Sequence, residues 1–175
     1  MLTVRLIQRD IGEIASMQWW FKYPELMRRS FNLWPPFWLT GIKVEKVAPD
    51  YSYARVKLKW RPWTRNLNGS QFGGSLFSMT DPIYTTLLLA RLGIKRYYVW
   101  DQAAEIVFKK PAYGAVWFEA EVSDAFIEDI RQQTASGEKY LPKVVNRLVN
   151  KNGDLIAEVN RTLYVRLRPA FRPKQ

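Results

Sequence analysis

The chain contains neither cysteine nor histidine. Without these residues it has no thiolate nucleophile, no Ser-His or Cys-His pair and no zinc site with the usual nitrogen and sulfur ligands. Acid-base chemistry would therefore depend on carboxylates, lysines or tyrosines. The lack of cysteine also excludes disulfides and favours a reducing compartment, so we expect a cytoplasmic protein.

Long apolar runs are also missing. No stretch approaches the roughly 20 apolar residues that a membrane-spanning helix needs. The opening stretch carries Arg5, Arg9 and Asp10, where a signal peptide would be apolar, so we expect no leader and no membrane partner. No repeat or interdomain linker is visible in the 175 residues. We therefore expect one domain over residues 1–175, with a helical extension and connector over 1–40 and the core over 41–168.

Apolar and basic residues are abundant. Hydrophobic residues make up 47% of the chain and aromatic residues 15%, a composition that excludes disorder caused by low hydrophobicity. The 27 lysines and arginines outnumber the 16 acids and give a net charge of +11, which attracts polyanions such as nucleic acid, anionic lipid or a phosphorylated cofactor. However, Arg55, Lys57 and Lys59 alternate with apolar residues, as expected for the solvated face of a strand. Basicity alone therefore identifies no partner.

Helical periodicity occurs in two regions. Between residues 12 and 33 the apolar spacing predicts one broken helix or two short helices, interrupted at Pro24. The following stretch NLWPPFW predicts an extended connector, because each proline restricts the residue before it. A second helix is expected over 75–93, ending at Gly93. Its apolar surface is wider than a narrow stripe, so we expect it to be buried on most sides.

Six segments have the alternation that is typical of strands: 41–48, 51–60, 97–110, 114–126, 142–150 and 154–168. The polar stretch 127–139 fits either a helical turn or a loop. Because the second helix can bury its wide apolar surface only if a sheet curls over it, the order of elements predicts an α+β hotdog fold.

One stretch, from Arg65 to Pro82, gathers three of the nine glycines. It contains the pattern N-x-x-G-x-x-F-G-G-x-L-x-x-x-x-D, running from Asn66 to Asp81. This pattern resembles the active-site signature of hotdog acyl-CoA thioesterases of the phenylacetyl-CoA type. The wider text over about residues 30 to 168 is similar to a bacterial subfamily of thioesterase-like proteins with an FGG...DP motif.

The resemblance implies a role for each matching residue. Gly73 and Gly74 would begin the central helix, where the Gly73 N-H would bind the oxyanion of the thioester. Asp81 would act as base or nucleophile, and Asn66 would orient water or substrate. Phe72 stands where the family has histidine, a change that would weaken turnover, alter substrate preference or abolish catalysis.

Further substrate-binding candidates lie outside the signature. Related enzymes have a polar residue near the position of Asp101 that reaches the active site across a dimer interface, although a strand-edge charge is the plainer interpretation. Glu105 lies four residues further along, and we expect it on the same strand face. Arg65, Lys109 and Lys110 would meet the phosphates of coenzyme A, or would simply be solvated.

Asp81 and Pro82 also have purely local interpretations. Asp as N-cap with Pro at the first helical position is a common helix start. If the helix begins near Gly74 instead, Pro82 is interior and destabilises it by about 3 kcal/mol. In that case Asp81 would lie at the edge of the apolar sector beside Leu88, where burial would raise its pKa.

We therefore expect a homodimer or homotetramer that hydrolyses the thioester of acyl-CoA or acyl carrier protein. Coenzyme A would enter as part of the substrate, and no metal or separate cofactor is expected. One alternative is a hotdog protein that binds acyl-CoA or lipid without catalysis. Another is a basic β protein that binds nucleic acid, which is disfavoured because the aromatic residues are expected to face the core and no nucleic-acid motif is visible. A hotdog dehydratase is least favoured, since that chemistry uses a histidine with an acid.

Overall fold

The structure is a computed structural model that describes residues 20–173, so the expectations for residues 1–19 lie outside the described residues. Along the chain, the elements are η1 (Trp20–Lys22), α2 (Pro24–Leu33), α3 (Pro35–Thr40), β1 (Ile42–Val47), β2 (Tyr53–Leu58), η2 (Pro62–Thr64), α4 (Gly73–Ser78), α5 (Ile83–Leu92), β3 (Tyr97–Phe108), β4 (Val116–Glu121), α6 (Asp124–Gln133), β5 (Lys143–Asn150), β6 (Leu155–Leu167) and η3 (Pro169–Phe171).

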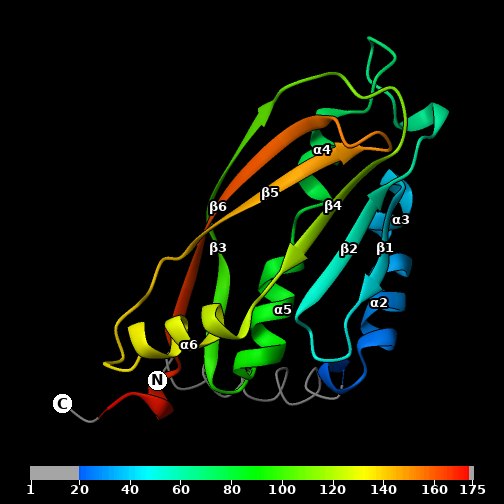
Figure 1. Ribbon diagram of the computed structural model, residues 1–175. Helices are drawn as coiled ribbons and strands as arrows, with labels where there is room; N and C mark the ends of the chain where they lie inside the picture. The colour runs from blue at the N-terminus through cyan, green and yellow to red at the C-terminus, as the bar shows by residue number, and fades with distance from the viewer. Residues whose placement is uncertain (1–19, 174–175) are drawn as a thin grey trace, which may run out of the picture.

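The six strands form one antiparallel sheet in the order β1-β2-β4-β5-β6-β3. The sheet curves around α5, as Figure 1 shows. Strand β6 alternates between buried and partly exposed residues, so that one face of the sheet packs on the helix. The predicted α+β hotdog architecture and all six strands are thus confirmed.

Helix α5 supplies the centre of the core. Its side chains are buried around most of its circumference, which matches the wide apolar surface seen in the sequence. Fully burying one leucine or isoleucine contributes about 1.5–3 kcal/mol, so this helix is a major source of stability. The buried residues of α5 are Ile83, Tyr84, Thr86, Leu87, Leu88 and Leu92.

The helix predicted over 75–93 is divided into two. Helix α4 ends at Ser78, and α5 begins at Ile83 after a turn that contains a cis peptide bond between Asp81 and Pro82. Pro82 is the N-cap residue of α5, and its carbonyl accepts a hydrogen bond of 3.0 Å from the N-H of Thr86. The expected N-cap role of Asp81 is therefore wrong, and so is an unbroken helix with Pro82 in its interior.

The prolines near the N-terminus begin helices. Pro24 starts α2, and Pro35 starts α3, a short helix where an extended connector was expected. Proline is tolerated in the first turn because an N-H there has no helical partner. Within the expected connector, Trp34 keeps the extended conformation expected before a proline, with ψ at 124°. Gly41 ends α3 in the left-handed region, with φ at 81°.

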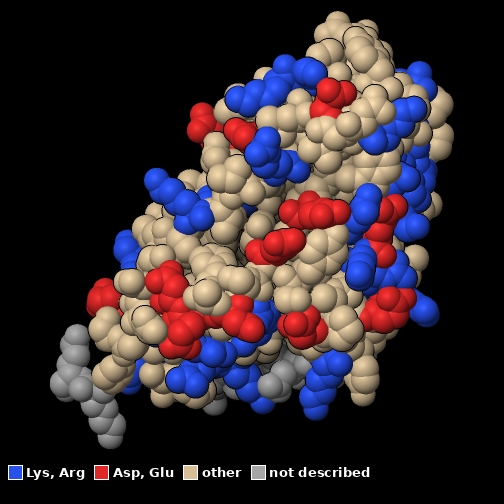
Figure 2. Space-filling model, viewed as in Figure 1, with Lys and Arg blue, Asp and Glu red and all other residues tan. Residues whose placement is uncertain are grey.

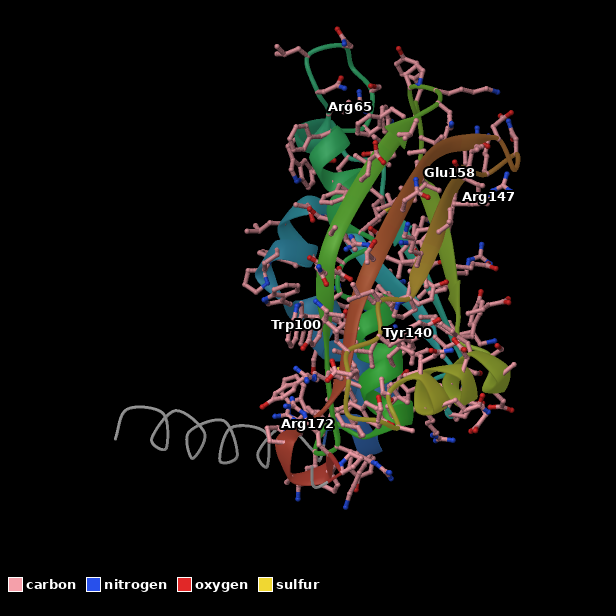
Figure 3. The ribbon with its side chains drawn as sticks, turned by 90° about the vertical axis from the view of Figure 1, so that its left-hand side faces the viewer. Arg65, Trp100, Tyr140, Arg147, Glu158 and Arg172 are labelled. Atoms are coloured by element: carbon pink, nitrogen blue, oxygen red, sulfur yellow. The ribbon has the colours of Figure 1, made fainter. Side chains whose placement is uncertain are left out.

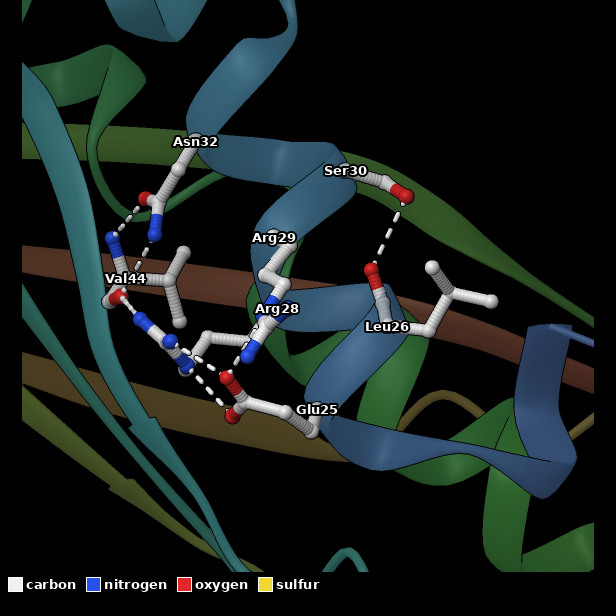
Figure 4. Close-up of polar contacts among 7 residues, drawn as sticks. All are labelled: Glu25, Leu26, Arg28, Arg29, Ser30, Asn32 and Val44. Atoms are coloured by element: carbon white, nitrogen blue, oxygen red, sulfur yellow. Dashed lines mark hydrogen bonds and ion pairs between the residues drawn. The ribbon is translucent and has the colours of Figure 1, made fainter.

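Helix α2 is fixed to the edge of the sheet at β1 (Figure 4). The side chain of Asn32 pairs with the backbone of Val44 in both directions, donating to its carbonyl at 3.0 Å and accepting from its N-H at 2.7 Å. Arg28 donates to the same carbonyl at 3.3 Å and pairs with Glu25 one turn away. These bonds satisfy the backbone of Val44 on β1, an edge strand that would otherwise be more open to another strand.

The segment after β4 is helical. The strand expected over 114–126 ends at Glu121. Helix α6 begins at Asp124, three residues before the stretch 127–139, for which the sequence fitted either a helical turn or a loop. Ser123 caps this helix, because its hydroxyl accepts the N-H of Phe126 at 3.1 Å. Within residues 20–173, no helix is both long and apolar enough to cross a membrane.

Replacement of a core leucine tests the central position of α5. Leu88 is 0% exposed, so Leu88→Ala should lower the free energy of unfolding by about 2–5 kcal/mol. Leu67 is 107% exposed, and Leu67→Ala should change it by less than about 0.5 kcal/mol. Urea denaturation followed by tryptophan fluorescence measures both, and similar effects for the two variants would contradict this placement.

Candidate active site

Asn66 organises the loop before α4. Its side-chain oxygen accepts from the N-H groups of Asn68 at 3.0 Å and Ser70 at 3.1 Å. Its amide nitrogen donates to the hydroxyl of Ser70 at 2.9 Å. The local loop thus occupies both ends of the amide, and the suggested role in orienting water stays a prediction.

The two glycines lie under aromatic rings. A Cβ at Gly73 would lie 2.9 Å from the ring of Phe108, and a Cβ at Gly74 would lie 2.4 Å from the ring of Phe72. Only glycine fits both positions without movement of these rings. Because Gly73 is the first residue of α4, no earlier helical carbonyl is available to its N-H.

A pocket of about 340 Å³ opens beside the start of α4. It brings together four of the residues singled out in the sequence, from the loop, from α4 and from the end of β3. Lys110 also pairs with Asp154 at 3.2 Å, at the turn between β5 and β6. The pocket is lined by Asn66, Ser70, Gln71, Gly73, Leu76, Phe108, Lys109, Lys110, Pro111 and Ala112.

Gln71 fixes one wall of this pocket. Its side-chain nitrogen donates to the carbonyls of Lys59 at 3.1 Å and Gly114 at 2.9 Å, which ties the loop to the ends of two strands. Its buried side-chain oxygen has no partner within the described residues. Both hydrogens of the amide are used, so only the acceptor remains for a ligand.

Asp81 lies past the other end of α4. Its side chain is exposed in the single chain, so it is not in the partly buried position considered above. Six helical residues rise about 9 Å, which separates Asp81 from Gly73 by more than the size of a thioester group. The two residues therefore do not converge on one pocket within a single chain, although the resemblance implies that both act on one thioester.

Arg65 lies at one end of the molecule, and Arg172 marks the other, with Trp100 between them on β3 (Figure 3). The guanidinium of Arg65 stacks over Trp60, 4.2 Å from the ring centroid. This contact holds Arg65 outside the lining of the pocket that contains Gly73.

A buried polar cluster lies beneath the break between α4 and α5. Arg161, on β6, is only 3% exposed. Its guanidinium donates to the hydroxyl of Thr80 at 2.6 Å and 3.3 Å and to one carboxylate oxygen of Asp101. The other oxygen of Asp101 is buried and has no partner within the described part of the chain. The cluster joins the helix break to strand β3.

A β-bulge between Asp101 and Ala103 sets the direction of these side chains. Asp101 lies opposite Leu163, which is buried, whereas Glu105 lies opposite Asn160, which is exposed. Since the bulge adds one residue to β3, the two acids face opposite sides of the sheet. The expected acid pair on one face is therefore wrong.

The surroundings of Asp101 shift its titration. Burial raises the pKa of its carboxyl group, the charge of Arg161 opposes this shift in part, and the charge of Asp81 raises the pKa further. Asp81 is therefore close enough to the cluster for the two carboxylates to interact. A carboxyl group with a raised pKa beside the helix break is typical of a functional site.

Arg161 and Asn146 were not predicted as site residues from the sequence. Both occupy core-facing strand positions between apolar neighbours; Arg161, for example, lies between Val159 and Leu163. The alternation of the strands could therefore have shown that these two polar side chains face the core. Asn146 is fully buried, and neither end of its amide has a partner within residues 20–173. Buried polar groups of this kind are rare in cores that serve packing alone.

Comparison with solved structures identifies the fold class. A probable thioesterase from Pseudomonas aeruginosa has 21% sequence identity and a TM-score of 0.75, covering 82% of this chain and 95% of its own. The Escherichia coli PaaI protein of the phenylacetic acid degradation operon has 17% identity and a TM-score of 0.52, covering 75% and 83%. Mouse thioesterase superfamily member 2 has 17% identity and a TM-score of 0.57, covering 82% and 96%. At these identities the likeness establishes the fold, which is the hotdog fold.

The family assignment rests on the sequence. The model for a domain of unknown function, DUF4442, matches residues 24–165, and the chain belongs to this family. No curated protein matches the sequence.

The raised pKa of Asp101 predicts a pH dependence of stability. Between the unfolded pKa of about 3.9 and the higher folded pKa, the folded chain binds more protons than the unfolded chain, so stability falls as pH rises. This contribution is fully present below the unfolded pKa and is lost above the folded pKa. Asp101→Asn removes the titration, and its free energy of unfolding should therefore increase relative to wild type as pH rises from about 4.

Urea denaturation of both proteins across this pH range measures the difference. Parallel curves for wild type and Asp101→Asn would show that the folded and unfolded pKa values of Asp101 are equal.

Proposed function

We propose that the protein is a thioesterase that hydrolyses an acyl thioester of coenzyme A or acyl carrier protein, using Asp81 and the N-H of Gly73. The observation that carries the proposal is the pocket at the start of α4, where Gly73 meets a rim formed by Lys109 and Lys110. The match to the thioesterase signature and the hotdog neighbours described as thioesterases support it.

Each part of the proposed site suits one part of such a substrate. The lysines provide charge-assisted hydrogen bonds for the phosphates of the carrier. The N-H of Gly73 would stabilise the negative charge that develops on the carbonyl oxygen. Asp81 would remove a proton from water as the water attacks the carbonyl carbon, and this proton would then pass to the departing thiolate. Asp81 attacking the carbon directly is the other route.

The separation of Gly73 from Asp81 requires two chains for one site. Strand β3 is a long edge strand, and its outer half exposes the apolar side chains of Val107 and Phe108. Such an edge is open to pairing with another strand. Pairing of two β3 strands about a two-fold axis would bring Gly73 of one chain toward Asp81 of the other. The proposed enzyme is thus a homodimer or a larger assembly of dimers, with two shared sites per dimer.

Phe72 is the reason for the main alternative, a protein that binds acyl-CoA without hydrolysing it. It stands at the histidine position of the signature, is exposed, and packs its ring against Gly74. The proposed chemistry uses a backbone N-H and a carboxylate, and neither depends on the side chain at position 72. If turnover did require the imidazole, the same pocket would still bind acyl-CoA, which is the non-catalytic alternative.

Nucleic acid binding has less support, although one argument against it was wrong. Many aromatic side chains expected in the core are exposed, among them Trp34, Trp38, Trp63 and Trp100, because they lie on helices, in a loop and at the sheet edge. The face shown in Figure 2, however, mixes acidic side chains among the basic ones across its middle and lower parts. This face is therefore not a continuous basic surface, which is the kind of surface that favours binding to a polyanion.

Mixing two inactive variants tests the shared site. Gly73→Pro removes the N-H at a first helical position, where proline is tolerated, and also places a Cβ beside Phe108, while Asp81→Asn removes the base. Each alone should lower kcat by about 10²-fold or more in an acyl-CoA hydrolysis assay. After subunit exchange, half of the dimers hold one intact site out of two, so about a quarter of wild-type activity should return.

The matched control is Gly73→Ala, which adds the same Cβ beside Phe108 but keeps the N-H, and it should retain more activity than Gly73→Pro. If mixing restores nothing although mass spectrometry shows mixed dimers, the two residues do not share a site between chains. If Asp81→Asn hydrolyses as fast as wild type, Asp81 has no catalytic role.

A further inference from the structure

A second hollow lies between α2 and the start of α5. It has a volume of about 580 Å³, within the range of small-molecule sites. Six of its seven lining residues are apolar; four of the seven belong to α2, and the others come from η1, from the residue after α2 and from Pro82, which follows Asp81. The lining residues are Trp20, Met27, Ser30, Phe31, Leu33, Trp34 and Pro82, and we call this hollow the α2 groove.

The polarity of the α2 groove restricts what can occupy it. Among residues 20–173, no charged side chain lines it. The hydroxyl proton of Ser30 is directed to the carbonyl of Leu26 at 2.9 Å, within the helix itself (Figure 4). A charged ligand group would therefore lose its hydration and gain no charged partner among the described lining residues, which is unfavourable. A hydrocarbon would lose only unfavourable contact with water.

The groove is a fixed feature of the fold. The side of α2 that faces away from it is held to β1 by the two hydrogen bonds between Asn32 and Val44 (Figure 4). Phe31, on the groove side, stacks on Phe37 with ring centroids 5.7 Å apart, and Phe37 is buried in the core. The helix is thus held from both sides and cannot simply collapse onto Pro82.

The position of the groove connects it to the proposed chemistry. Pro82 lines it and directly follows Asp81, so a carbonyl carbon held at Asp81 would have its acyl substituent at the mouth of the groove. The basic pocket lies at the opposite end of α4. A site shared by two chains would therefore place the carrier of the thioester on the pocket of one chain and its acyl group on the groove of the other.

We propose that the α2 groove binds the hydrocarbon chain of the acyl group and so favours acyl thioesters of medium to long chain. The inference rests on the proposed thioesterase function, because Asp81 fixes the carbonyl end of the chain. Each methylene that enters the groove strengthens binding by about fourfold, until the groove is full.

Binding of non-hydrolysable thioether analogues tests the groove without turnover. Isothermal titration calorimetry with S-alkyl coenzyme A, from butyl to hexadecyl, should show affinity rising with chain length and then reaching a plateau. Leu33→Asp places a charge at the groove on a side chain that is 78% exposed, so folding should be unaffected. It should weaken binding of the dodecyl analogue by tenfold or more and leave the affinity for free coenzyme A unchanged.

Leu39→Asp is the matched control. Leu39 is 59% exposed on α3, outside the groove, and this variant should bind all analogues as wild type does. Ser30→Phe, which fills the groove without adding charge, should shorten the preferred chain.

Two failures can be separated. Affinity independent of chain length, or equal losses in Leu33→Asp and Leu39→Asp, would overturn the groove assignment even if Asp81-dependent hydrolysis is found. Affinity that follows chain length and is lost only in Leu33→Asp, in a protein that hydrolyses no acyl-CoA, would support the groove and reject the thioesterase proposal.

Discussion

The burial of α5 is the constraint on which the rest of the structure depends. A helix that is apolar around most of its circumference can be stable in water only if other elements enclose it. A single antiparallel sheet does this by curving, and α2 and α3 complete the enclosure beside β1 (Figure 1). At the start of α5 the chain passes from the surface into the core, so polar groups of the turn before α5 lie against buried residues there.

That meeting point explains the buried polar cluster. A buried arginine is unfavourable unless its hydrogen bonds are satisfied, and Arg161 finds its acceptors in Thr80 and Asp101. Thr80 immediately precedes Asp81, so the cluster fixes the turn from which the carboxylate of Asp81 projects. Packing alone would favour apolar residues at these positions. The cluster is better understood as support for the turn that carries Asp81.

The helices and strands that follow from a regular spacing of apolar residues were predicted from the sequence. Alternation located all six strands, and the wide apolar surface of residues 75–93 predicted a central helix, of which α5 is the longer part. The break before Pro82 was not predicted, because proline fits both a first turn and an interior defect, and only the packing around Arg161 and Thr80 decides between them. The bulge at Asp101 and the helix after Trp34 likewise depend on contacts distant in sequence or on turn geometry. The pocket was predicted only as a set of matching residues, since no local pattern shows that Gly73 and Asp81 lie at opposite ends of α4.

A polar, basic pocket and an apolar groove lie at the two ends of α4, and in the proposed enzyme two chains would combine them around one thioester. A crystal structure with dodecyl-thioether coenzyme A bound would test this most directly. The account predicts the sulfur between the Gly73 N-H of one chain and the carboxylate of Asp81 in the other, with the alkyl chain in the α2 groove. An analogue bound within a single chain, or away from both hollows, would contradict it.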